Sequence, residues 1–218
     1  MAWTTPVTAN SGEVLTAARY NVEVVANSVM GNPVYTNEAA RDAAITAPSE
    51  GMRVYLTTPT VPAATGATTF LPTGITTIYN GTSWVCVTPV GAYTGTQGTT
   101  TSGSFTATLT SGGTNPSVTL TTGATAMVSI AMAAYNNNGQ LNVMGVAVSG
   151  ATTIAATLDA AVQHATPLVG GVATELTLSN RLIISGLTAG TNTFTLQYYV
   201  GGNTMFASRR RIIVEGIA

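Results

Sequence analysis

The sequence predicts a mainly β protein that ends in a jelly-roll-like β-sandwich, and three observations indicate this fold class. Residues 181–215 consist of β-branched and aromatic runs of strand length, separated by Gly and Asn turns. Within residues 192–198 the large apolar side chains recur every second residue, as a half-buried strand requires: Phe194, Leu196 and Tyr198. Similar runs recur at near-regular spacing from Ser104 onward, which is typical of a sandwich.

The expected strands of the sandwich follow from these runs and from the turns between them. They are residues 104–109, 117–121, 125–134, 143–148, 152–157, 175–178, 181–185, 192–199, 204–207 and 210–215. Residues 158–164 fit either a short helix or an edge excursion, and the pair Gly170–Gly171 fits a loop tip. We therefore expect residues 104–218 to form one β-sandwich domain.

Residues 1–31 predict an extended arm followed by a short trimerising helix. Trp3 and Pro6 lie in the polar arm, and Trp3 suits a pocket on a neighbouring chain or local packing equally well. The helix is expected from Thr16, a good N-cap, to Met30, before Gly31 and Pro33. Its apolar residues are spaced four, three and four apart, which is the seam of a coiled coil: Ala18, Val22, Val25 and Val29. Either this seam joins three parallel helices or it packs on its own domain.

Residues 32–90 predict a small α+β module that would form a collar. A short strand at 34–35 precedes a helix capped by Asn37, and another strand is expected at 52–57. Residues 58–74 read as a loop, and 77–87 as a hairpin on an Asn-Gly turn. Residues 91–103 are rich in Thr and Gly, so we expect them to form a linker between the module and the sandwich.

Charge is scarce in this chain. Charged residues make up 7% of it and all seven basic residues are Arg, while the mean hydropathy is +0.32. Such a composition favours an oligomer that buries surface between subunits, although a Thr-rich monomer surface is the alternative. The net charge of −1 gives no basic footprint for nucleic acid. We expect neither a signal peptide nor a membrane span, and hence synthesis in the cytosol.

Residues for catalysis or for a metal site are sparse. The chain has one histidine, His164, and one cysteine, Cys86, which we expect to be buried in a strand. Asp159 lies near His164, but no nucleophile motif accompanies them, so an exposed loop histidine is the simpler interpretation. We therefore expect a protein that is not an enzyme and that needs no cofactor or metal.

Three consecutive arginines, Arg209–Arg211, form the longest run of charged residues in the sequence. On a strand, Arg209 and Arg211 share one face and Arg210 takes the other, and we expect the run to contact a partner or to pair with Glu175 or Glu215 within an assembly. The aromatic residues nearby predict either core packing or a platform for stacking sugars: Tyr198, Tyr199 and Phe206.

Several segments of the chain resemble small virion proteins of tailed bacteriophages, many of them minor tail proteins. At the N-terminus the similar residues are 2–6, 12–18 and Asn21. The module shares 39–45, 50–52, 55–57 and 79–85 with a unit common in phage tail and fibre proteins. The C-terminal region is similar to the β domain of those proteins in residues 148–153 and 186–195.

This resemblance implies a virion structural protein, a homotrimer docked on other phage proteins by its N-terminal arm with the β domain displayed. It is compatible with a minor tail or fibre-like protein and, alternatively, with a capsid decoration protein or head fibre. A module that binds a host receptor or surface glycan is an alternative of another class.

Overall fold

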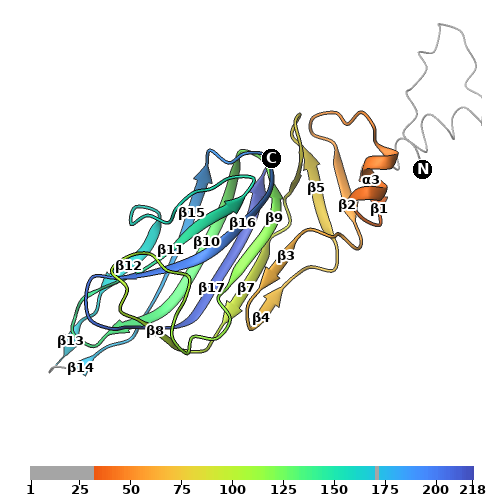
Figure 1. The fold of residues 1–218 in the computed structure, drawn as a ribbon. Coiled ribbons are helices and arrows are strands. Elements are labelled where there is room, and N and C mark those ends of the chain that lie inside the picture. Colours follow the sequence, from red (N-terminus) through yellow and green to blue (C-terminus); the bar gives the residue numbers. More distant parts are fainter. Residues whose placement is uncertain (1–31, 170–171) are drawn as a thin grey trace, which may run out of the picture.

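The computed structural model describes residues 32–169 and 172–218, which form a small α+β module at one end of a β-sandwich (Figure 1). The module holds a four-stranded sheet in the order β1-β2-β5-β6. Its strands are β1 (Val34–Tyr35), β2 (Arg53–Leu56), β5 (Ile75–Tyr79) and β6 (Trp84–Cys86). Helix α3 (Glu38–Ala44) follows β1, as the sequence predicted.

Local signals of the sequence explain both features of the module that were predicted correctly. Asn37 is the N-cap of α3, because its side chain accepts a hydrogen bond from the backbone N–H of Ala40 at 3.0 Å. In the β5–β6 hairpin, Asn80 Oδ1 accepts from the backbone N–H groups of Thr82 and Ser83. Gly81 has a φ of 89°, which is easily reached only without a side chain. The predicted hairpin on the Asn-Gly turn is thereby confirmed.

The sandwich consists of two sheets that face each other. We name the first the β10 sheet; its order is β15-β10-β17-β7-β4, and β8 pairs with β17. It contains β4 (Thr68–Phe70), β7 (Val90–Thr94), β8 (Gly98–Thr100), β10 (Thr125–Asn136), β15 (Leu176–Ser185) and β17 (Met205–Ile217).

The second sheet, the β16 sheet, has the order β12-β11-β16-β9-β3. It contains β3 (Ala63–Thr65), β9 (Ser117–Thr122), β11 (Leu141–Gly150), β12 (Ala161–Ala165) and β16 (Gly190–Val200). The chain crosses between the sheets at β9–β10, β10–β11, β15–β16 and β16–β17, so sequence neighbours seldom pair. This alternation makes the sandwich jelly-roll-like, as predicted. A separate hairpin of β13 (Leu168–Val169) and β14 (Val172–Ala173) lies at the end far from the module (Figure 1).

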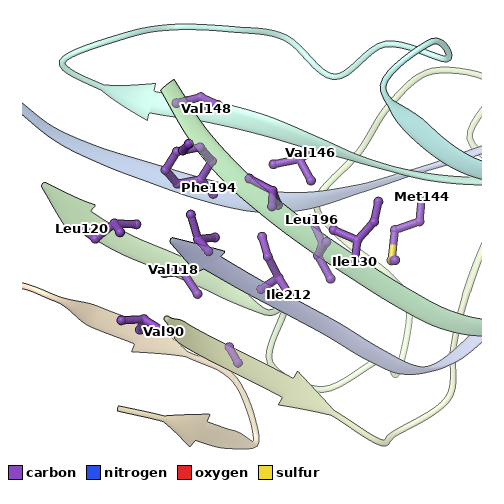
Figure 2. Close-up of a cluster of buried hydrophobic side chains, with 14 of the residues drawn as sticks. Val90, Val118, Leu120, Ile130, Met144, Val146, Val148, Phe194, Leu196 and Ile212 are labelled. Atoms are coloured by element: carbon purple, nitrogen blue, oxygen red, sulfur yellow. The ribbon is translucent and has the colours of Figure 1, made fainter. Parts of the chain in front are cut away.

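The core lies between the two sheets and is lined by alternate residues of both. Figure 2 shows side chains of β9, β11 and β16 meeting those of β7, β10 and β17. The predicted inward row of β16 is confirmed, because three of its side chains are fully buried: Phe194, Leu196 and Tyr198. Burial of one such large side chain contributes about 1.5–3 kcal/mol, so this row anchors the β16 sheet. Cys86 is buried as well, and burial raises the pKa of its thiol to about 11.

Residues 91–103 are not a linker, which corrects the prediction. Val90–Thr94 pairs with β17 as β7, and Gly98–Thr100 pairs with it as β8. Gly91 lies in the expected linker, but a Cβ there would lie 3.1 Å from both the Phe70 ring and the Ile213 side chain. The glycine is present because two large neighbours pack over it.

The module is attached to the sandwich by pairing and close packing. Residues 58–74, expected as a loop, supply β3 and β4, which pair with β9 and β7. A Cβ on Gly216 of β17 would lie 2.6 Å from the carbonyl oxygen of Cys86 and from Cγ1 of Val85. Because these backbones approach so closely, strand β6 of the module lies directly on the sandwich.

Other strand predictions differ from the structure at the edges and at one bulge. Residues 104–109 and 152–157 make only isolated bridges, Thr106 with Tyr198 and Ile154 with Val148. The pairs predicted at 175–178 and 181–185, and at 204–207 and 210–215, are single strands, β15 and β17. In β17 the register with β10 shifts between Ala131 and Ala133, where Arg209 has a φ of 50°. This one-residue bulge lets a strand of such length continue across the sheet.

Candidate assembly surface

The outward side of strand β9 and of β16 up to Gln197 is polar and uncharged. Its strands β9 and β16 present Ser, Thr and Gln between the buried core residues, and we name this surface the threonine face: Ser117, Thr119, Thr121, Thr191, Thr193, Thr195 and Gln197. Thr119 and Thr193 are cross-strand partners whose hydroxyl oxygens lie 2.8 Å apart. The hydroxyls satisfy one another and water, so this surface is stable in solvent without charge.

The outward side of the β10 sheet is apolar at many positions. We name it the apolar face: Phe70, Tyr93, Met127, Ser129, Ala131, Ser179, Arg181, Ile183, Arg211, Ile213 and Glu215. Ile183 is 71% exposed and Phe70 is 45% exposed. Met127 lies beside Ile183 in the register, and Ile213 lies beside Ser129. A sheet surface with large exposed apolar side chains is typical of a surface that a partner covers.

A shallow depression of about 320 Å3 lies in the middle of the apolar face. It forms because Ser129, Ala131 and Ser179 are small, while longer side chains on the flanking strands β15 and β17 rise on both sides. Those longer side chains include Arg181 on one flank and Arg211 on the other. The depression therefore combines a floor of small side chains with two cations at its margins.

Arg211 is held in place by aromatic rings. Its guanidinium carbon lies 5.4 Å from the ring centre of Tyr93 and 5.6 Å from that of Phe70. Cation–π contacts of this kind contribute about 0.5–1 kcal/mol at exposed sites. Among the described residues no carboxylate pairs with Arg211 or Arg181, and none of the arginines pairs with Glu215 on the same face. The apolar face thus offers both signs of charge to a partner.

Arg209 pairs within its own chain, on the outer side of β17. Its Nη1 lies 3.2 Å from Oε1 of Glu175, and the Ser208 hydroxyl donates to the same carboxylate at 3.4 Å. The sequence predicted Glu175 as one possible partner, although within an assembly. An exposed pair like this one contributes about 0–1 kcal/mol.

Arg210 is buried in the core, so the expectation that it contacts a partner was wrong. It is 1% exposed and donates to the Tyr198 hydroxyl at 3.2 Å, to the carbonyl of Thr96 at 3.3 Å and to the carbonyl of Gly112. The Tyr198 hydroxyl in turn donates to Asn115 Oδ1 at 2.7 Å. Burial raises the pKa of Tyr198 to about 12 although Arg210 opposes the rise. Arg210 therefore joins the segment after β8 to strands β16 and β17.

The remaining predicted site residues lie outside the described residues. They are the helix seam of Ala18, Val22, Val25 and Val29, and the arm residues Trp3 and Pro6. Arg211 of the apolar face was named in the sequence as a possible partner contact, but the exposed apolar residues Phe70 and Ile183 were missed. The available signal for Ile183 was the consecutive run Leu182–Ile184, since three apolar residues in a row place two side chains on one side of a strand and one on the other.

Catalytic groups do not converge in the part of the chain that the structure describes. No three His, Cys, Asp or Glu residues cluster within residues 32–169 and 172–218, and no helix there is long and apolar enough to cross a membrane. His164 lies half-buried in β12 instead of an exposed loop, and burial lowers its pKa. The sugar platform is not formed: Tyr198 is in the core, Tyr199 contacts Phe105, and Phe206 stacks on Tyr135.

Fold and site together define a β-sandwich module with one solvated outer face and one apolar outer face. No family model and no curated protein matches the chain. Among solved structures, it is similar to Eiger TNF from S. frugiperda, with 9% identity, a TM-score of 0.40 and coverage of 59% of this chain and 92% of that one.

Two further solved structures are similar to part of the chain. The globular domain of zebrafish complement 1qA has 9% identity and a TM-score of 0.28, covering 56% of this chain and 98% of that one. A structure of infectious bursal disease virus, Gx strain, has 12% identity and a TM-score of 0.32, covering 66% of this chain and 46% of that one. Likenesses at these scores carry no argument about function, which rests on the residues described above.

Proposed function

We propose that this chain is a structural subunit of a bacteriophage virion. In this proposal it is a trimeric surface appendage of the minor tail or fibre-like kind, docked by its N-terminal segment with the sandwich displayed. The phage assignment is supported by the resemblance of the three segments named in the sequence. The assembly is supported by one structural observation, the apolar face of the β10 sheet.

The occupant of the apolar face is a second copy of the chain, for two reasons. The β10 sheet has three strands of 10, 12 and 13 residues and the shorter strands β4, β7 and β8. With strands about 4.8 Å apart and a rise of about 3.3 Å per residue, its face covers roughly 700–750 Å2, close to the ~800 Å2 per partner of a stable interface. The face also carries Arg181 and Arg211 together with Glu215, so it is complementary in charge to a copy of itself. In a closed ring of three copies, each copy meets its two neighbours through different parts of its surface, so Glu215 of one copy would lie against the arginines of the next.

The first experiment is the mass of the purified protein by light scattering, with and without residues 1–31. A trimer in both cases supports the proposal and assigns the assembly to the apolar face. A trimer that falls to monomers on truncation would move the assembly to the helix seam. A full-length monomer would overturn the trimer.

The second experiment locates the chain on purified virions of a phage that encodes it, with gold-labelled antibodies in electron microscopy. Label at the tail supports the tail appendage. Label over the capsid supports the alternative of a decoration protein or head fibre, and virions free of label would overturn the structural role.

A further inference from the structure

A second cavity lies between the module and the sandwich, away from the apolar face. Its volume is about 270 Å3, and it is lined by Glu38, Arg41, Val61, Ile75, Thr77, Ser83, Trp84, Cys86 and Thr121. These residues come from α3, the β5–β6 hairpin, the segment before β3, and β9 of the sandwich. A single water occupies about 30 Å3, so the cavity has room for a small organic molecule.

One polar group in the wall lacks a partner. Ser83 Oγ is buried from solvent, and within the described part of the chain no donor or acceptor lies in reach of it. A buried hydroxyl without a hydrogen bond costs about 1–3 kcal/mol in proteins, so Ser83 Oγ has its full hydrogen-bonding capacity available to a molecule in the cavity. Thr77 and Thr121 add two more hydroxyls to the same wall.

The ionic groups of the wall already have hydrogen-bond partners, and they are one carboxylate and one guanidinium. Arg41 Nε donates to Asp42 at 2.8 Å, and the guanidinium carbon lies 4.7 Å from the ring centre of Trp84. The carboxylate of Glu38 accepts from the backbone N–H and the hydroxyl of Thr60 and from the backbone N–H of Val61. Burial would raise the pKa of Glu38, but these hydrogen bonds hold it below its usual value. The site therefore carries no net charge that would select an ion.

We infer that this cavity binds one neutral sugar ring, a pyranose in size. A sugar supplies hydroxyls that donate to and accept from Ser83, Thr77 and Thr121, and its C–H groups suit the apolar wall of Val61, Ile75 and Trp84. Trp84 is rigid, because Arg41 covers it and the Tyr79 ring lies 5.5 Å away. The inference goes beyond the proposed structural role and does not depend on it.

The test uses the full chain and four probes, namely D-glucose, D-galactose, D-mannose and N-acetyl-D-glucosamine, each titrated to 50 mM, about the range of weak single-ring binding. Saturation-transfer NMR detects binding, and tryptophan fluorescence in a Trp3→Phe background reports on Trp84. We expect saturable binding of at least one sugar.

Two variants test whether the sugar occupies this cavity. Ser83→Ala should weaken the sugar binding about five-fold, the effect of one hydrogen bond. Thr121→Leu, which fills the cavity, should abolish the binding. Ser149→Ala on the exposed end of β11 is the matched control and should bind like the wild type.

Three outcomes would overturn the inference. The first is a folded wild-type protein that saturates with none of the four sugars. The second is binding that Ser83→Ala and Thr121→Leu both leave unchanged, which would place the sugar elsewhere. The third is saturable binding of inorganic phosphate, with loss in Thr121→Leu and no response to the sugars, which would show that the site takes an anion.

Discussion

The two outer faces of the sandwich differ in chemistry although both belong to sheets of similar size. On the threonine face, Thr119 and Thr193 satisfy each other across two strands, and no apolar side chain there is as exposed as those opposite. On the apolar face, Ile183 is 71% exposed and cations flank a floor of small residues. The low charge of the chain is thus compatible with water on one side and with a protein partner on the other.

The largest effect should come from charges placed on the apolar face. We expect the Ile183→Asp, Ile213→Asp double variant to be monomeric, because each site buried at an interface contributes at least about 2 kcal/mol. Light scattering over a range of concentrations measures this, and circular dichroism checks the fold. The Thr191→Asp, Thr195→Asp double variant adds the same charge to the threonine face and should leave the mass unchanged. Equal dissociation by both changes would remove the difference between the faces.

The next largest effect concerns Arg210, which is buried in the core between the two sheets. Arg210→Met should lower the free energy of unfolding by about 3 kcal/mol, because it leaves buried carbonyls and the Tyr198 hydroxyl without their donor. Urea denaturation of Arg210→Met and Arg209→Met gives the comparison. The Arg209 change should cost less than about 1 kcal/mol. Equal losses of stability in the two variants would show that the buried hydrogen bonds of Arg210 contribute no more than the exposed ion pair of Arg209.

A smaller effect should come from reversing charge on the apolar face. Arg181→Glu and Glu215→Arg should each weaken the trimer by about 1–2 kcal/mol, and the double variant should recover most of the loss because the pairing is restored. Sedimentation equilibrium measures the association constant, and added salt should reduce the single effects. A double variant whose loss equals the sum of the single losses would show that these residues do not meet.

The smallest effect belongs to the edge of the β16 sheet. Burial lowers the folded pKa of His164 below the usual value of about 6.5. As the pH falls, the unfolded state therefore binds a proton before the folded state does. The contribution to stability is full above about 6.5 and declines as the pH falls from there toward the lower pKa of the folded state. Urea midpoints between pH 7 and pH 5 should decline less in His164→Gln than in the wild type. Parallel declines would assign the pH dependence to other groups.

Features that depend on a few adjacent residues were predicted correctly from the sequence. Asn37 as a cap, the Asn80–Gly81 turn and the inward row that includes Phe194 each follow from a few adjacent residues. Even the division of the three arginines was predicted correctly, with Arg210 on the side opposite its neighbours.

Features that depend on distant residues were not predictable. Gly91 reads as flexible until Phe70 and Ile213 are seen to pack over it. Arg210 pairs with the carbonyl of Gly112, 98 residues away, and nothing near either residue signals that contact. The exposure of Ile183 depends on which side of β15 is covered by the β16 sheet, which is a property of the fold. The cavity between the module and the sandwich is lined by residues of four separate segments of the chain.

The bulge in β17 has a consequence for how the chain tolerates changes in length. Arg209 and Arg210 together oppose Met132, so β17 is one residue longer than its pairing with β10 requires. A chain without Arg209 would keep Arg210, Ile212 and Val214 pointing inward and would lose mainly the ion pair to Glu175, worth about 0–1 kcal/mol. Thermal unfolding of the deletion variant should therefore show a folded protein. The longest strand of this protein would thus accept a deletion at its centre, a change that is ordinarily tolerated only in loops.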